Sequence, residues 1–362
     1  MTQTTITIDG RMIGYGHPPF IIAEISANHN GSVETAMRLI DAAKAAGADA
    51  VKLQTYKPET ITLDSDAPEF TIEGGLWDGR TLFDLYKEAH MPWEWHAPLF
   101  AYARKIGITI FSSPFDSTAI DLLETLNAPA YKIASFEAVD TPLIRYAART
   151  GKPLIISTGM ADDQEIEAAI RAARSAGCTQ LAILHCVSGY PAAPDEYNLL
   201  TIPDMVRRFG EITGLSDHTI DNTTSIAAVT LGAAIIEKHF TLDRNGVGPD
   251  NSFSLEPEDL AGLCNSARTA WNALGQVNYA RKESEKGNIK LRRSLYFVRN
   301  ISKGAMITPG DIKSVRPGYG LPPKEYDRIV GRTATRDITY NTPVTLEAVG
   351  LREDTSLIQT AT

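Results

Sequence analysis

Short runs of apolar, mostly β-branched residues alternate with longer amphipathic segments along the first three-quarters of the chain. The short runs have the length and composition of buried strands, and the longer segments repeat their apolar positions with the period of a helix. We predict strands at 20–26, 50–54, 109–113, 130–135, 154–158, 181–186, 211–218 and 234–240. We predict helices at 33–47, 118–126, 163–177, 225–232 and 256–275.

This alternation favours an α/β fold, and eight strand–helix units in about 250 residues favour a closed (β/α)8 TIM barrel. An open, doubly wound sheet is the alternative. Such a sheet normally carries a glycine-rich turn after its first strand, and the stretch AEISANHNG (23–31) lacks the GxGxxG spacing.

The pattern changes after residue 277. Residues 278–292 are polar and charged, as is typical of a linker. Residues 299–312 and 336–349 then resemble each other: each has Arg, Ile two positions later, a turn, and Ile-Thr or Val-Thr at the same offset. We predict a catalytic barrel at 1–277, a linker at 278–292, a small β-rich domain of two related arches at 293–350, and a flexible tail at 351–362.

Composition excludes several classes of protein. The net charge of −9 argues against a nucleic-acid partner, which requires a clustered basic surface. No apolar run approaches the roughly 20 residues that span a bilayer, and the first residues do not resemble a signal peptide. Cys178, Cys186 and Cys264 form no CxxC pair, so we expect free thiols and a cytoplasmic location.

Every predicted strand carries polar residues at or just after its carboxyl end, where barrels of this class bind their ligands. Any one of them could cap a helix or plug the barrel. Eight such strand ends indicate a site, because a buried charge without partners costs several kcal/mol. These residues are Glu24, Lys52, Gln54, Ser113, Lys132, Ser135, Ser157, Ser188, Tyr190, Ser216, His218, Glu237 and His239.

The alternation of side chains along a strand sorts some of these residues by direction. Residues two apart face the same side, so Lys52 points with Gln54, and Glu237 points with His239. Lys238 must point the other way, toward the helix layer. We therefore predict that Lys238 is structural.

Two kinds of chemistry follow from the residue types. Lys52 and Lys132 can cradle a phosphate together with short hydroxyl donors, namely Ser113, Ser135, Ser157 and Ser216. His218 and His239 lie at matching depth on neighbouring strands and could share one cation. Two imidazoles leave positions open for water and a substrate oxygen, which suits Mn²⁺, Co²⁺ or Mg²⁺. The alternative is a pair of polar plugs hydrogen-bonded to their neighbours.

Several ordered motifs resemble the sialic acid synthase family: IIAEISANHNG, KIASFE, LHCVSGYP, GLSDHT, GAAIIEKHFTLD and RPGYGL. Members of this family condense phosphoenolpyruvate with an amino sugar. The resemblance covers essentially the whole chain. It implies a (β/α)8 barrel, a C-terminal domain similar to type III antifreeze proteins (the SAF domain), and a divalent metal, Mn²⁺ in the first place.

The resemblance also implies a role for each matching residue. Phosphoenolpyruvate would be held by Lys52, Lys132, Ser135, Ser157 and Ser216, with Ser113 as a further donor. The metal ligands would be His218 and His239. Glu24 would be central to catalysis, and the sugar side would be lined by Gln54, Tyr190 and Glu237. Relatives often have Asn where this chain has Ser188, and a hydroxyl lacks the reach of an amide.

Arg316, in the RPG motif, matches an arginine that the SAF domain delivers to the active site of a partner subunit. The resemblance therefore implies a domain-swapped homodimer.

Within the family, residues 56–64, 74–96 and 111–116 resemble the pseudaminic acid synthase branch. Its sugar substrate is 2,4-diacetamido-2,4,6-trideoxy-β-L-altropyranose, and phosphate leaves by C–O cleavage. The insertion 70–96, with its tryptophans, would either wall the sugar pocket or pack over the barrel mouth. The alternatives are an acetylneuraminate, legionaminate or spore-coat sugar synthase and, in another class, a carbohydrate-binding protein without activity.

Overall fold

The computed structural model describes residues 5–352, and the chain in it divides into two compact units, Met1–Gly275 and Gln276–Thr362. The division falls two residues before the predicted domain boundary, directly after the helix that ends at Leu274. Most of the predicted tail, from residue 353 on, lies outside the described residues.

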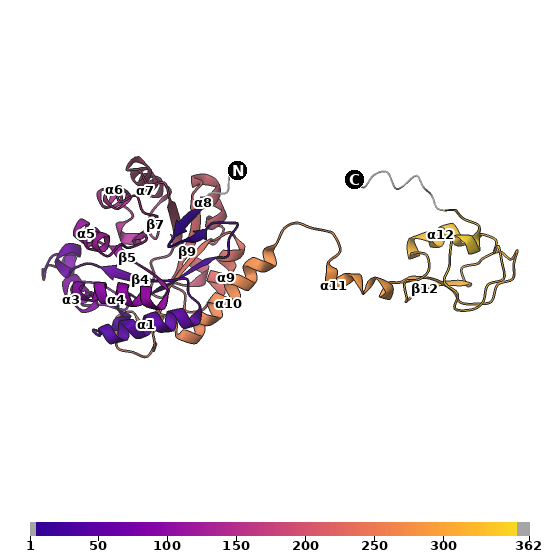
Figure 1. Cartoon of the computed structure of the whole chain (residues 1–362), viewed down its shortest axis with the longest axis horizontal. Coiled ribbons are helices and arrows are strands. Elements are labelled where there is room, and N and C mark those ends of the chain that lie inside the picture. The colour runs from indigo at the N-terminus through magenta and orange to yellow at the C-terminus, as the bar shows by residue number, and fades with distance from the viewer. Residues whose placement is uncertain (1–4, 353–362) are drawn as a thin grey trace. The chain divides into compact units, whose positions relative to one another are not determined.

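The first unit is a closed parallel barrel with strand order β10-β3-β4-β5-β6-β7-β8-β9 (Figure 1). All eight predicted strands are confirmed, each to within two residues at both ends. They are β3 (Phe20–Glu24), β4 (Ala50–Thr55), β5 (Thr109–Pro114), β6 (Tyr131–Ile133), β7 (Leu154–Ser157), β8 (Leu181–Cys186), β9 (Ile212–Asp217) and β10 (Ile235–His239).

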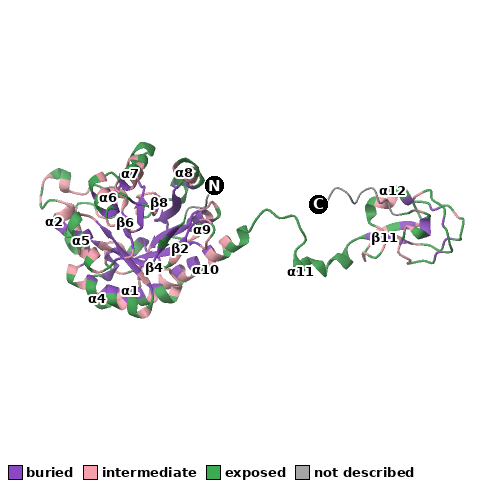
Figure 2. Ribbon diagram, turned by 45° about the horizontal axis from the view of Figure 1, so that its top comes forward, coloured by how far each residue is buried: buried purple, intermediate pink, exposed green. Residues whose placement is uncertain are grey.

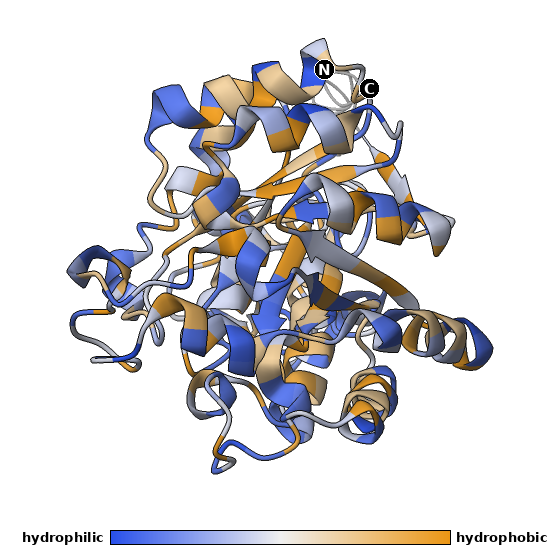
Figure 3. Cartoon of the chain, turned by 90° about the vertical axis from the view of Figure 1, so that its left-hand side faces the viewer, coloured by the Kyte–Doolittle hydropathy of each residue, from blue (hydrophilic) through white to orange (hydrophobic). Residues whose placement is uncertain are grey.

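Helices surround these strands. The predicted ones are α1 (Val33–Ala46), α5 (Ser117–Thr125), α7 (Asp163–Ser175), α9 (Thr223–Thr230) and α10 (Pro257–Leu274). Those outside the prediction are α2 (Pro58–Ile61), α3 (Leu82–Ala89), α4 (Trp93–Ile106), α6 (Thr141–Ala148) and α8 (Thr201–Phe209). Hydrophobic and hydrophilic positions are interspersed along them, as amphipathic helices require (Figure 3).

Apolar packing occupies one end of the barrel. A hairpin of β1 (Ile6–Ile8) and β2 (Arg11–Ile13), which was not predicted from the sequence, buries its isoleucines against the first residues of the barrel strands, such as Phe20 and Ile235. The strands are buried throughout, while the outer helix faces are exposed (Figure 2). Because this end is plugged, the polar side chains gather at the other one.

The second unit includes the predicted linker, which contains the short helix α11 (Glu283–Lys286). The predicted small β-rich domain that follows is built on β11 (Ser294–Phe297) and β12 (Ile312–Val315), with the short helix α12 (Tyr326–Ile329). Its repeat is visible in the backbone. The equivalent residues Ile301 and Ile338 exchange hydrogen bonds of 2.9 and 2.8 Å, and the equivalent residues Gly304 and Asn341 both have positive φ. The two arches therefore have matching turns and pair with each other.

Within residues 5–352, no helix is both long enough and apolar enough to cross a lipid bilayer.

Candidate active site

Lys52 lies at the centre of the polar cluster at the carboxyl ends of the strands. Its Nζ is 2.8 Å from Glu24 Oε2 and 3.1 Å from Glu237 Oε1, and it donates to Ser113 Oγ at 3.2 Å. All four side chains are almost fully buried, with Glu237 the most exposed at 5%. Three neighbouring strands, β10, β3 and β4, thus supply a carboxylate–ammonium–carboxylate group sealed from bulk water.

The two lysines of the cluster have different environments. Burial lowers the pKa of Lys52, but the carboxylates of Glu237 and Glu24 outweigh this and raise it above its ordinary value. Lys132 Nζ lies 3.5 Å from Glu237 Oε1, its one ion-pair partner among the described residues, and burial holds its pKa below the ordinary value. The charge of Lys52 is therefore balanced by two carboxylates, whereas Lys132 could pair with a further anion.

The two carboxyl groups are also separated by their surroundings. Burial raises the pKa of Glu24 above its ordinary value, and Lys52 offsets only part of this effect. Burial acts on Glu237 as well, but Lys132 and Lys52 together outweigh it and lower its pKa. The two pKa values are therefore shifted in opposite directions: Glu24 is the more readily protonated of the two, and Glu237 is the more readily ionised.

Three of the predicted serines lie at or just after the carboxyl ends of neighbouring strands, Ser135 after β6, Ser157 at the end of β7 and Ser188 after β8. Ser135 Oγ accepts from the backbone N–H of Gly159 at 3.2 Å, and a side chain at Gly159 would collide with both Ser188 and Ser135. The hydroxyls of Ser157 and Ser188 are buried without a hydrogen-bond partner among the described residues. Unpaired buried donors are costly, and an oxyanion would satisfy them.

His218 and His239 lie side by side, with 5.5 Å between ring centroids. The carbonyl oxygen of Val187 accepts from His218 Nδ1 at 2.7 Å, which leaves the lone pair on Nε2. His239 Nδ1 is buried without a partner among the described residues. Burial lowers the pKa of His218 to about 4 and that of His239 well below its usual range, so both rings are neutral.

Two neutral imidazoles with free lone pairs fit a divalent cation. Among residues 5–352, no group of three or more His, Cys, Asp or Glu side chains is arranged to hold a metal ion. Any cation here would keep positions for water and substrate oxygens, as the sequence analysis expects.

An aromatic wall faces the histidines. The ring centroids of Tyr190 and His218 are 4.3 Å apart, with an interplanar angle of 32°, and those of Phe253 and His239 are 5.0 Å apart. Trp77, from the insertion, packs against Tyr190 at 5.8 Å and donates to Pro249 O at 3.2 Å. This wall is the best candidate surface for the apolar side of a sugar.

The other two tryptophans of the insertion pack elsewhere. Trp95 contacts the ring of His29, and Trp93 lies beneath the ammonium of Lys57. Of the three, Trp77 is the one that contacts a predicted site residue.

Two acidic residues near the site, Asp250 and Glu137, were not singled out from the sequence. Gln54 Nε2 donates to Glu24 Oε1 at 3.1 Å and to Ser26 Oγ at 2.9 Å, and Ser26 in turn donates to Asp250. Burial raises the pKa of Asp250, and it raises that of Glu137 to about 7 against the opposing charge of Lys132. Asp250 and Glu137 lie in loops, where periodicity gives no signal, although Glu137 ends the KIASFE motif.

The structure therefore places the predicted barrel residues at one end of the barrel and connects most of them directly. Arg316 belongs to the second unit, where it follows β12 and is exposed.

Comparisons with known proteins give a consistent result. Residues 39–279 match the NeuB family, and residues 292–349 match the SAF domain. The chain is 44% identical to a pseudaminic acid synthase of Helicobacter pylori, over 92% of this chain and 98% of that one. It is 35% identical to an N,N'-diacetyllegionaminic acid synthase of Legionella pneumophila, over 91% and 94%.

A solved structure agrees. The N-acetylneuraminic acid synthetase of Leptospira borgpetersenii, crystallised with citrate, superposes with a TM-score of 0.71 at 32% identity, over 79% of this chain and 95% of that one.

Proposed function

The chain belongs to the NeuB family and carries a SAF domain, and we propose that it condenses phosphoenolpyruvate with 2,4-diacetamido-2,4,6-trideoxy-β-L-altropyranose, giving pseudaminic acid and phosphate. The family membership agrees with the sequence motifs. The higher identity to the pseudaminic acid synthase than to the legionaminic acid synthase supports the choice of sugar. One observation carries the proposal: a buried lysine–carboxylate cluster, unpaired serine hydroxyls and two neutral histidines meet at one barrel mouth.

Phosphoenolpyruvate carries a phosphate and a carboxylate, and the cluster offers partners for both. Among the described residues, Lys132 has one ion-pair partner, Glu237, and the hydroxyls of Ser157 and Ser188 have no hydrogen-bond partner. Binding of an anion here would satisfy these groups and neutralise charge that develops as the phosphate leaves.

His218 and His239 would hold the divalent cation, Mn²⁺ in the first place, with Co²⁺ or Mg²⁺ as alternatives. When bound, it supplies Lewis-acid polarisation of the sugar's aldehyde oxygen. Tyr190 and Trp77 would orient the open-chain sugar against it.

In the proposed reaction the methylene carbon of phosphoenolpyruvate forms a bond to the aldehyde carbon. Water adds to the resulting cationic carbon, and the tetrahedral species releases phosphate by C–O cleavage, leaving a 2-keto acid. Glu24, whose pKa is raised by burial, would transfer a proton in this reaction, and its contacts with Lys52 and Gln54 would orient its carboxyl group. Glu237 stays anionic and keeps both ammonium groups in position.

The proposal is tested by measuring phosphate release with phosphoenolpyruvate, Mn²⁺ and a panel of sugars. We expect kcat/KM for the altrose derivative to exceed that for N-acetylmannosamine by about 100-fold or more, because polar groups left unpaired by the wrong sugar are costly. Preference for N-acetylmannosamine or a legionaminic acid precursor would move the chain to another branch. No phosphate release with any sugar would favour a binding protein.

We further propose that Arg316 completes the site of a partner subunit in a domain-swapped homodimer. Arg316→Ala and Glu24→Ala should each be nearly inactive alone. A mixed dimer would retain one intact site, so random subunit exchange should restore about a quarter of the wild-type activity. Enzyme assays before and after co-refolding measure this recovery. Absence of recovery, with mixed dimers verified by differential tags, would contradict the swap.

Trp77 offers a test of the sugar wall. Trp77→Ala should raise the KM for the sugar about 10-fold through loss of aromatic contact with the substrate, while the KM for phosphoenolpyruvate stays nearly constant. Trp93→Ala, in the same insertion, is the matched control and should leave the KM for the sugar nearly unchanged. Equal changes in both KM values for Trp77→Ala would indicate general disruption of the barrel mouth instead.

A further inference from the structure

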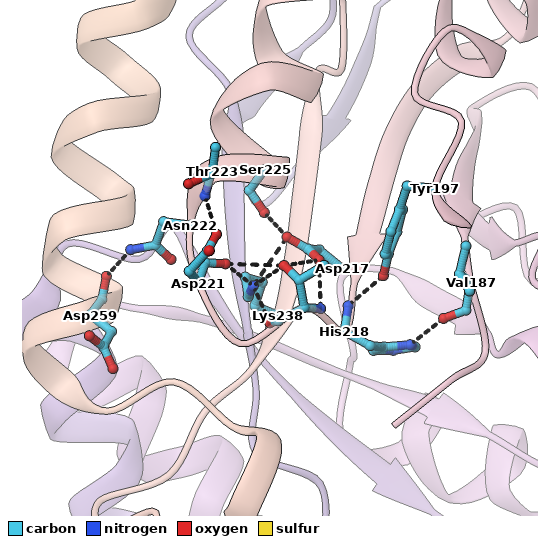
Figure 4. A network of polar contacts seen from close by, with 11 residues as sticks. Val187, Tyr197, Asp217, His218, Asp221, Asn222, Thr223, Ser225, Lys238 and Asp259 are labelled. Atoms are coloured by element: carbon cyan, nitrogen blue, oxygen red, sulfur yellow. Dashed lines mark hydrogen bonds and ion pairs between the residues drawn. The ribbon is translucent and has the colours of Figure 1, made fainter. Parts of the chain in front are cut away.

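Lys238 directly precedes His239 in the chain and pairs across the sheet with Asp217, which directly precedes His218, and the reaction gives it no role. It is only 2% exposed, and its side chain points toward Asp217 and Asp221 (Figure 4), whereas its neighbour Glu237 contacts Lys52 inside the barrel. Its ammonium lies 3.1 Å from Asp217 Oδ2 and donates to Thr219 O at 2.7 Å, to Thr219 Oγ1 at 3.3 Å and to Asp221 O at 2.6 Å. All four acceptors belong to the short segment 217–221.

Asp217 closes this segment from the other side. Thr219 donates to Asp217 Oδ1 through its backbone N–H at 2.9 Å and its hydroxyl at 2.8 Å, and Ser225 donates to Oδ2 at 2.5 Å. Asp217 and Lys238 are direct partners in the β9–β10 register. The carboxylate and ammonium therefore fold the chain into a compact turn and tie it to both strands and to α9.

His218 is the residue within this turn whose ring faces the site. Its backbone N–H donates to Tyr197 Oη at 2.7 Å, and its Nδ1 is fixed by Val187 O. Its position depends on the residues on either side, Asp217 and Thr219, and Lys238 binds both. His239, the other predicted ligand, directly follows Lys238 in the chain. One buried ammonium thus links the backbone positions of both histidines.

A lysine that served only to satisfy a buried charge would not need all its acceptors in one turn. Buried ion pairs are often replaceable by apolar residues without loss of stability, so the concentration of contacts on one turn calls for another reason. Besides its ion pair with Asp217, the Lys238 ammonium donates to two backbone carbonyl groups, those of Thr219 and Asp221, and both belong to the turn that carries His218.

We propose that Lys238 is a positioning residue for the divalent cation: it fixes the 217–221 turn so that the His218 ring is held at the correct distance from His239. This inference rests on the proposed function in one respect, namely that the two histidines bind a metal. It adds a residue outside the barrel interior that determines the affinity for the ion.

The test measures Mn²⁺ binding to the full-length protein by electron paramagnetic resonance, without substrates. Lys238→Met keeps the length of the side chain but removes the ammonium, and we expect the Kd for Mn²⁺ to rise about 10- to 100-fold, the range seen when partners of metal ligands are removed. Lys152→Met, which removes an ammonium paired with Glu124, is the matched control. Its Kd should equal that of the wild type.

Ser225→Ala is a second, milder variant that tests the same turn if Lys238→Met fails to fold. It removes one hydrogen bond to Asp217 and should weaken Mn²⁺ binding in the same direction by a smaller factor. Wild-type Kd in both folded variants would overturn the role of Lys238 and leave the proposed function standing. Failure of the wild-type protein itself to bind Mn²⁺ would instead overturn the metal site, and the positioning role with it.

Discussion

His239→Ala is expected to lower kcat about 1000-fold, even when Mn²⁺ is saturating. The variant would retain a single imidazole, and Lewis-acid polarisation supplies several kcal/mol of transition-state stabilisation. A loss of about 4 kcal/mol corresponds to three powers of ten in rate. The measurement is phosphate release at saturating phosphoenolpyruvate and sugar, across a range of Mn²⁺ concentrations.

His17→Ala is the matched control, because His17 lies in the loop before β3, at the plugged end of the barrel. It should turn over at the wild-type rate. Near wild-type turnover by His239→Ala would exclude a metal role for this histidine. A large drop in kcat with unchanged binding of phosphoenolpyruvate would show that the histidine acts in the reaction and not in binding the phosphate and carboxylate.

The sequence predicts the barrel well because its strands have an unambiguous signal. Buried parallel strands are continuous apolar runs, and each is flanked by a periodic helix or a turn. The prediction fails where that signal is weak. α4 contains Pro98 within the helix, and the strands of the β1–β2 hairpin are only three residues long.

The direction of side chains could also be predicted. The alternation that places Glu237 and His239 on one face and Lys238 on the other holds in the structure, since Lys52 contacts Glu237 and Lys238 contacts Asp217. What alternation cannot give is the set of partners. That the Lys238 ammonium fixes the turn around His218 depends on how a loop folds, and loops have no period.

For the same reason, Phe253 and Asp250 were missed. Both follow β10 in an irregular segment, and they reach the site only because the backbone returns over the barrel mouth. The predicted alternative for the insertion, simple packing, holds for Trp93 and Trp95 but does not describe Trp77, which contacts Tyr190.

Lys52→Met should produce the largest combined loss of stability and activity. Lys52 separates two buried carboxyl groups, at 2.8 Å from Glu24 and 3.1 Å from Glu237. Removing one partner of a buried ion pair typically costs about 3–5 kcal/mol of unfolding free energy. Loss of this charge from the site should lower kcat/KM about 1000-fold. Chemical denaturation and initial-rate assays measure the two effects.

The stability loss should depend on pH in a defined direction. Without Lys52, the pKa values of Glu24 and Glu237 should rise, so the folded variant binds more protons than the unfolded chain above the ordinary glutamate value of 4.5. Stability then falls as pH rises from there through the raised folded pKa. The deficit against wild type should therefore be larger at pH 8 than at pH 5. Lys152→Met, which breaks a partly exposed pair with Glu124, should cost about 0–1 kcal/mol at both pH values. A deficit for Lys52→Met that does not change with pH would show that the two carboxyl groups do not share this ammonium.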